Sequence, residues 1–310
     1  MTSGRRRGAR GKCSMHSSSA VALFLVVLAP AAPASTQSPG AGTPTSAPVR
    51  EVTATIGSAV NPAGLMARVE VNWRRSISRS KSRALSDAHF SFGVSPELTP
   101  SYVRAAIWAE LAPVSFFGVR AGVEPAVYFG TFSSLVSFAD VQQPFDSKTM
   151  RARRDEAETG TALRMYVRPS FRLKVGRVGG EVNAQVERWE SSAAGPFFLE
   201  PSRNTLVSVR SGRVTCLSTA VLYDVSRVLG VGGAYELTQV QGAVANRIQR
   251  AGPLVTYVPR FAVPALGRPT ITAVAGTYLQ DPHRRGQMFA ALGLGFALKR
   301  ADGSRVGGLR

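Results

Sequence analysis

Residues 163–175 read LRMYVRPSFRLKV, and residues 176–189 continue with GRVGGEVNAQVERW. In the first segment the odd positions are apolar or proline, and the even positions from Arg164 to Lys174 are polar. The second segment alternates in the same way, with Val182, Ala184 and Val186 opposite a row of acids and amides. Strict alternation on both sides of a glycine-rich turn predicts a β-hairpin with one apolar and one charged face.

The same alternation recurs along most of the chain, and no convincing amphipathic helix interrupts it. The segments are 68–74, 88–95, 103–111, 119–129, the two of the hairpin, 213–225, 228–240, 249–259, 269–280 and 286–299, and 51–59 is one more. Their lengths suit tilted membrane strands. Because a bacterial barrel with both ends on one side needs an even number of strands, we expect about 12, within a range of 10–14.

The links between these segments differ in length. Residues 130–160 and 190–211 are long links, whereas 176–180 and 226–227 are tight turns. Long loops at one end and short turns at the other are typical of outer-membrane barrels. The links before residue 118 do not separate cleanly in this way, so the register there stays open. Pro169 lacks a backbone N–H, which predicts a local bulge in a closed barrel.

Two environments for the apolar face are possible, lipid or the core of a secreted soluble β-rich protein. Three observations favour lipid: the polar face is unusually charged, the apolar face is almost free of charge, and aromatic residues cluster near segment ends. Closure into a barrel also removes the sheet edges that lipid cannot satisfy. The sequence therefore predicts an all-β fold, a closed antiparallel transmembrane β-barrel.

The chain of 310 residues carries a net charge of +19, and 44% of it is hydrophobic. Residues 1–34 have the pattern of a secretory signal peptide, with a basic start, a short apolar stretch and a small-residue cleavage site. Residues 35–50 are rich in Pro, Ser, Thr and Gly and predict a disordered linker. Cys13 lies in the signal peptide, so Cys216 is left as a single thiol, which excludes an intrachain disulfide.

The pattern over residues 51–299 resembles that of bacterial outer-membrane β-barrel proteins. Gly293, Phe296 and Leu298 have the relative spacing of the carboxy-terminal assembly signal of that class, although Ala291 replaces a usual polar residue and a tail, 300–310, follows. Residues 61–65 and 196–201 look like segments of uncharacterised barrels. The resemblance implies an outer-membrane location, with membrane lipids, lipopolysaccharide and the barrel assembly machinery as partners, and no nucleic acid.

One candidate for chemistry is His89 with Ser91, because residues i and i+2 of a strand share a face and the imidazole could activate the hydroxyl. The pair resembles the His-x-Ser pairs of outer-membrane lipid hydrolases, but Phe92 follows where asparagine is common. Two polar lumen residues are the simpler interpretation. Asp281 and His283 lack a third ligand, so no metal site and no cofactor is predicted.

The basic run 151–154 in the first long loop is either an anchor to the anionic outer leaflet or a solvated cluster. The charged face itself predicts a ladder inside the barrel, formed by Arg68, Arg104, Glu110, Arg120, Glu124, Arg164, Arg168, Arg172, Glu181 and Glu187. Arginine and glutamate rows on adjacent strands pair across the sheet. The leading hypothesis is a non-enzymatic barrel, either a porin-like passage for small anionic solutes or a structural or surface-binding barrel. The alternative is a lipid hydrolase.

Overall fold

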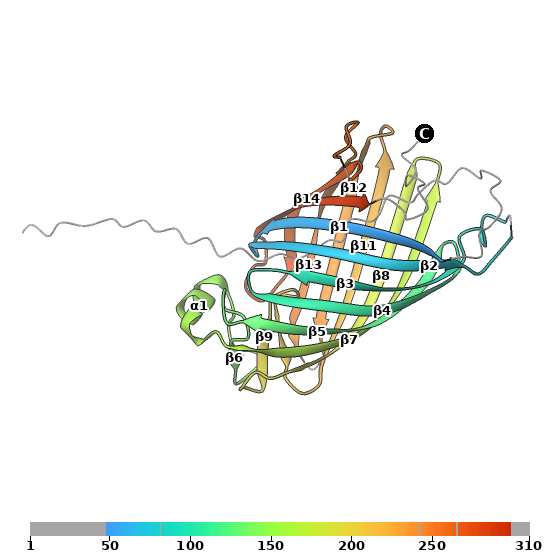
Figure 1. Cartoon of the computed structure of the whole chain (residues 1–310). Helices are drawn as coiled ribbons and strands as arrows, with labels where there is room; N and C mark the ends of the chain where they lie inside the picture. The colour runs from blue at the N-terminus through green and yellow to red at the C-terminus, as the bar shows by residue number, and fades with distance from the viewer. Residues whose placement is uncertain (1–47, 81, 242, 265, 299–310) are drawn as a thin grey trace, which may run out of the picture.

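The computed structural model describes residues 48–80, 82–241, 243–264 and 266–298. Within them, twelve strands close into an antiparallel barrel, shown in Figure 1. The strands are β1 (Val49–Val60), β2 (Gly64–Ser76), β3 (His89–Leu98), β4 (Tyr102–Val114), β5 (Phe117–Phe129), β7 (Thr159–Val175), β8 (Val178–Ser191), β11 (Gly212–Asp224), β12 (Leu229–Val240), β13 (Ala243–Tyr257), β14 (Pro269–Gln280) and β15 (Met288–Leu298). The predicted fold class is confirmed.

The seam of the barrel lies between the first and last strands. β1 pairs with β15 in an unbroken register from Val52 opposite Leu298 to Val60 opposite Ala290. Each of the other barrel strands pairs with the barrel strands that come before and after it in the chain. Closure therefore leaves none of the twelve strands with an open edge, as lipid demands.

The walls follow the period of two that the sequence predicts. Along β3, buried and exposed residues alternate at every position from His89 to Leu98. Most outward side chains are apolar and exposed, for example Ile107 at 60% and Val186 at 55%. In the hairpin of β7 and β8, Arg164 and Glu187 point inward and are buried. The apolar face is thus the outer wall, and the charged face lines the lumen.

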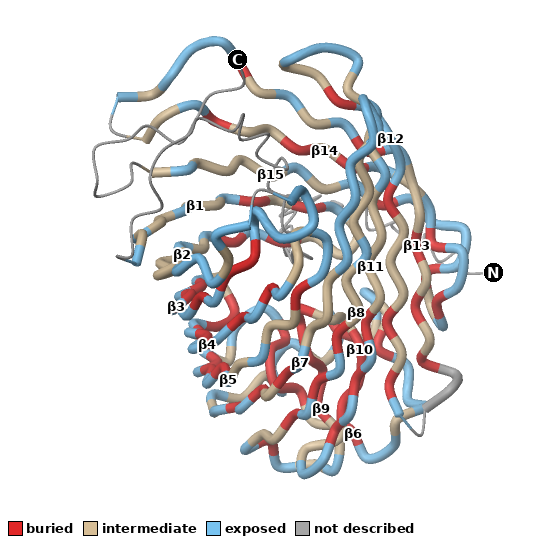
Figure 2. The backbone as a smooth tube through the Cα atoms, turned by 90° about the vertical axis from the view of Figure 1, so that its right-hand side faces the viewer, coloured by how far each residue is buried: buried red, intermediate tan, exposed pale blue. Residues whose placement is uncertain are grey.

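The two long links lie together at the end of the barrel opposite the first residue of β1 and the last of β15 (Figure 1). They carry a small sheet of β10 (Thr205–Ser208), β9 (Phe197–Glu200) and β6 (Ser137–Phe138), with the helices α1 (Ser147–Ala152) and η1 (Arg154–Glu156). We call this the loop end and the other the terminus end. Figure 2 shows that buried residues gather where β6, β9 and β10 meet the barrel.

The structure corrects several details of the sequence prediction. The links 77–88 and 258–268 are long but lie at the terminus end, so long and short links do not separate strictly. β1 begins at Val49, inside the predicted linker, and β13 begins at Ala243 instead of 249. The signal peptide, Cys13 and the tail 300–310 lie outside the described residues.

The bulge predicted at Pro169 is wrong. Pro169 keeps its place opposite Val119 on β5, and the β7–β8 register is the same before and after it, with Val167 opposite Val186 and Ser170 opposite Asn183. Because a missing N–H removes one hydrogen bond without adding a residue, the ladder skips the position without shifting. Register shifts occur instead between β4 and β5, β12 and β13, and β13 and β14.

Candidate functional site

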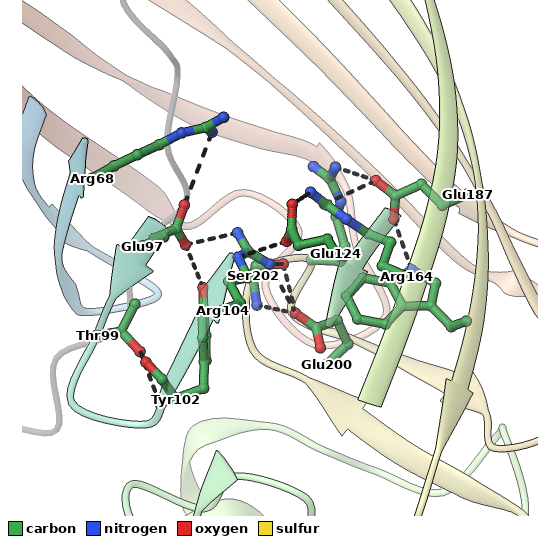
Figure 3. Close-up of polar contacts among 12 residues, drawn as sticks. Arg68, Glu97, Thr99, Tyr102, Arg104, Glu124, Arg164, Glu187, Glu200 and Ser202 are labelled. Atoms are coloured by element: carbon green, nitrogen blue, oxygen red, sulfur yellow. Dashed lines mark hydrogen bonds and ion pairs between the residues drawn. The ribbon is translucent and has the colours of Figure 1, made fainter. Parts of the chain in front are cut away.

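The predicted charge ladder lies inside the barrel and is densely paired on the wall from β2 to β8. At its centre, Glu124 lies between two guanidinium groups, with Oε1 2.8 Å from Nε of Arg104 and Oε2 2.5 Å from Nη2 of Arg164 (Figure 3). Arg104 also reaches Glu97 at 2.7 Å, and Arg164 reaches Glu187 at 3.4 Å. These five side chains are buried and lie on different strands, so the network ties β3, β4, β5, β7 and β8 together.

A second group of charges lies nearer the terminus end. Arg120 contacts Glu110 at 2.7 Å and Glu70 at 3.3 Å, and its guanidinium lies 3.7 Å above the Trp108 ring. Arg68 contacts Glu70 at 3.3 Å. A cation stacked on an aromatic face and paired with two carboxylates is well held in a partly desolvated site.

Three residues of the predicted ladder make weak ion pairs or none. Arg172 is 48% exposed and lies 3.8 Å from Glu110. Glu181 lies opposite Arg172 in the register, but the structure gives it a hydrogen bond from Asn183, at 3.0 Å, and no ion pair with another described residue. Arg168 lies opposite Arg120, and its guanidinium makes neither a hydrogen bond nor an ion pair with the described residues. It is therefore a cation of the lumen wall without a direct carboxylate contact.

The link between β8 and β11 enters the lumen and joins this network, which the sequence did not predict. Glu200, at the end of β9, is fully buried, accepts hydrogen bonds from Tyr128 and from the backbone and hydroxyl of Ser202, and lies 4.0 Å from Arg104. Arg104 donates to the Ser202 hydroxyl at 3.1 Å. Arg203 pairs with Glu187 on the wall. We call residues 197–208 the plug hairpin.

Apolar packing holds the plug hairpin as well. Phe198 and Val207 belong to one buried cluster with the inward side chains Tyr102, Tyr128, Trp189, Val214, Cys216 and Val240 of the barrel wall. The Trp189 and Phe198 rings meet edge to face at 6.3 Å. Burial of several large apolar side chains contributes about 1.5–3 kcal/mol for each. The plug hairpin is therefore a packed part of the fold.

A small cavity lies between the plug hairpin and the opposite wall. The cavity that Ser202 and Arg203 share with β12, β13 and β14 has a volume of about 10 Å³, and its wall includes Glu236, Arg250 and Tyr278. A cavity of this size holds about one water molecule. Arg250 pairs with Glu236 there, with Nε donating at 2.9 Å. At this point of the loop end, a water-sized cavity lies between the plug hairpin and the wall.

The link 281–287 between β14 and β15 also lies at the loop end. Asp281 caps the turn by accepting from the backbone N–H groups of His283 and Arg284, and its other oxygen accepts from Nη2 of Arg284 at 2.5 Å. The His283 ring meets Phe145 edge to face at 4.6 Å and accepts from the Phe145 backbone N–H at 3.4 Å. His283 therefore joins two loops, and among the described residues no cluster of three metal-ligating side chains includes it.

Acidification is expected to loosen this contact between loops. Burial lowers the pKa of His283 below its ordinary value, and the neutral ring is the form that accepts from Phe145. The stability it contributes is present above the unfolded-state pKa, about 6.5, and is lost as pH falls through the lower folded-state pKa. The protection factors of residues 141–152 against hydrogen exchange, corrected for the intrinsic exchange rate at each pH, should fall on acidification in the wild type, and this fall should be absent in His283→Phe. An equal fall of the protection factors in both proteins would contradict this role.

The basic run 151–154 lies at the end of α1 and in η1. Arg153 pairs with Glu156 at 2.6 Å and lies 4.4 Å from the Phe138 ring, whereas Arg154 is largely exposed beside Asp155. Asp146 caps α1, and its hydrogen bonds with Thr149 lower its pKa. The choice between a lipid anchor and a solvated cluster stays a prediction.

His89 and Ser91 both point into the lumen and are buried. The His89 Nδ1–H donates to the backbone carbonyl of Asp87 at 2.7 Å, and Nε2 lies 3.6 Å from Glu110. Neither ring nitrogen makes a hydrogen bond with the Ser91 hydroxyl in the described residues. No contact in the structure therefore favours the hydrolase hypothesis. The absence of a catalytic site, metal and cofactor stays a prediction.

The proposed assembly-signal residues lie on the seam. Phe296 and Leu298 face outward on β15, opposite Ala54 and Val52 of β1, and Gly293 faces the lumen opposite Gly57. The last strand thus completes the closure of the barrel. Its recognition by an assembly machinery stays a prediction.

A closed antiparallel barrel with an exposed apolar outer wall and a charged interior is a transmembrane β-barrel. The chain therefore has the fold that bacterial outer-membrane barrels share. Among the described residues no helix is long and apolar enough to cross a membrane.

No protein-family model and no curated protein matches the sequence. Solved structures with a similar fold include the KdgM porin, at 9% identity and a TM-score of 0.40, over 80% of this chain and 99% of that one. The beta domain of the Bordetella autotransporter BrkA is 12% identical, with a TM-score of 0.42 over 81% and 99%. LpxR from Salmonella typhimurium is 9% identical, with a TM-score of 0.36 over 79% and 99%.

Proposed function

We propose that the protein is a porin-like passage for small solutes that the plug hairpin holds closed. The observation that carries the proposal is the position of Glu200, Ser202 and Arg203 in the lumen. The cavity between Ser202, Arg203 and the opposite wall has a volume of about 10 Å³. An open pore would leave a continuous water-filled lumen at this level. In this state the barrel is sealed at the loop end.

The plug hairpin is separable from the barrel that it closes. β8 and β11 pair directly from Trp189 opposite Gly212 to Val178 opposite Tyr223, so the wall is complete without the link between them. The hairpin also has a narrow base, because the backbone N–H of Val209 donates to the carbonyl of Pro196 at 3.0 Å. A segment of this kind can leave the lumen while the barrel stays closed on itself.

The basic residues of the lumen wall toward the terminus end support the proposal that the solute is an anion. Along the inward face of β7, Arg168, Arg172 and Lys174 follow one another, and Arg168 has no carboxylate partner among the described residues. Arg172 and Lys174 are paired across the wall, with Glu110 at 3.8 Å and Asp224 at 2.8 Å. Because most lumen charges are paired, we expect a modest preference for anions, to which Arg168 contributes most.

The test is to replace the plug hairpin, residues 197–208, with a short Gly-Ser turn between Pro196 and Val209. In planar bilayers the wild type should be closed for most of the time, and the variant should conduct steadily with a reversal potential that favours anions. Arg168→Gln in the opened variant should reduce that preference. A matched control replaces residues 79–86, in a link at the terminus end, and should stay closed.

Heat-modifiable migration on a gel verifies that each variant is folded. A folded variant that stays silent would show that the lumen is not a passage. A wild type that conducts as steadily as the variant would show that the hairpin does not close the lumen.

We retain outer-membrane lipids, lipopolysaccharide and the barrel assembly machinery as proposed partners.

A further inference from the structure

Two arginines face each other on the outer wall of the barrel. Arg188 on β8 and Arg213 on β11 are partners in the register, and the buried residues that flank each of them point inward, so both point outward. Arg188 pairs with Glu190 at 2.9 Å, whereas the Arg213 guanidinium makes no hydrogen bond or ion pair with the described residues. Cβ atoms at such positions lie about 5 Å apart, and like charges there destabilise a sheet. The two guanidiniums therefore have one carboxylate between them, Glu190, and Arg213 has none among the described residues.

Their depth in the membrane follows from their place on the strands. β8 ends at Ser191 and β11 begins at Gly212, so both arginines lie beside the loop end. A basic residue on the lipid face is costly at mid-membrane and nearly free of cost near the interface. The two guanidiniums therefore lie at the level of the lipid headgroups, in the leaflet on the side of the long loops.

An apolar groove runs across the outer wall and ends at this pair. It has a volume of about 750 Å³, and its walls include Ile107, Val123 and Val167 together with Arg188 and Arg213. The register places Ile107 opposite Val123, Val123 opposite Met165, and Met165 opposite Arg188, so one row leads from mid-wall to the arginines. The next row carries Ala109 opposite Ala121, whose small side chains hollow the surface.

We propose that this groove binds one phosphate-bearing lipid of the leaflet at the loop end, with an acyl chain along the apolar row and the phosphate between Arg188 and Arg213. Two guanidinium groups match the oxygens of a phosphate group in geometry. The negative charge of the phosphate would offset the repulsion between the two arginines. The occupant follows from charge complementarity, because apolar contacts alone require no cation. The proposal goes beyond the passage function and does not depend on whether the lumen conducts.

The experiment uses the full chain reconstituted in nanodiscs of phosphatidylcholine that contain a small fraction of lipid A. After transfer to detergent, native mass spectrometry counts the lipid A molecules retained on each barrel. The wild type should retain one, and R188Q/R213Q should bind it at least tenfold more weakly. The matched control R50Q/R75Q removes two outward arginines at the terminus end and should retain lipid A as the wild type does.

A second variant tests the groove with the arginines intact. Ala109→Leu with Ala121→Leu fills the hollow and should also weaken retention, while heat-modifiable migration shows that the barrel remains folded. Unchanged retention in either variant overturns the proposal. A dimer of the wild type that R188Q/R213Q dissociates would also overturn it, because the occupant would then be a second copy of the chain. These results are independent of conductance, so failure here is distinct from failure of the proposed passage.

Discussion

Replacing Glu124 with glutamine is expected to lower the free energy of unfolding of the barrel by about 3–5 kcal/mol, the cost of breaking a buried ion pair from one side. The Glu124 carboxylate lies 2.8 Å from Arg104 and 2.5 Å from Arg164, and all three side chains are buried. The amide keeps the shape of the side chain but leaves the two guanidiniums without their shared counter-charge. The measurement is urea-induced unfolding in lipid vesicles, followed by tryptophan fluorescence.

A matched substitution on the surface serves as the control. Glu156 also pairs with an arginine, Arg153, at 2.6 Å, but its side chain is 55% exposed. Exposed ion pairs contribute little because water solvates both partners. Glu156→Gln should leave the unfolding midpoint unchanged. A midpoint for Glu124→Gln that also matches the wild type would show that the central network does not stabilise the barrel.

The walls of the barrel were predictable because the signal is local. A strand alternates with a period of two, so the faces of β7 and β8 follow from the residues 163–189 alone. The same rule predicted that the Arg104, Glu124 and Arg164 side chains would share one face. Their pairing followed in turn, because opposite charges on adjacent strands lie within reach of one another. Glu181 and Arg168 are exceptions, since neither makes an ion pair with another described residue.

The plug hairpin was not predictable, because its burial depends on contacts distant in sequence. Glu200 meets Arg104 and Tyr128, and Arg203 meets Glu187, across a lumen whose width is set by closure of the whole barrel. A signal was present in the run Phe197–Leu199, since three consecutive apolar residues are unexpected in a solvated loop. Alternation analysis does not use such a run, because it has no period.

The backbones of β13 and β14 approach each other very closely where two glycines meet, and we expect a side chain there to destabilise the barrel. The register of β13 and β14 places Gly252 opposite Gly276. A Cβ atom on Gly252 would lie 1.9 Å from the carbonyl oxygen of Ala275, and one on Gly276 would lie 2.0 Å from that of Ala251. Backbone atoms in a closed ladder cannot move aside singly, so even alanine at either position forces the strands apart.

Gly252→Ala and Gly276→Ala should therefore each destabilise the barrel by about 1–3 kcal/mol, the usual range for overpacking. The fraction of protein with heat-modifiable migration after refolding measures the effect. Gly179→Ala on β8 is the matched control, because no atom lies within 4 Å of its Cβ position, and it should refold as the wild type does. If all three variants refolded equally well, β13 and β14 would have room to separate, and the close approach of their backbones would not be needed for closure.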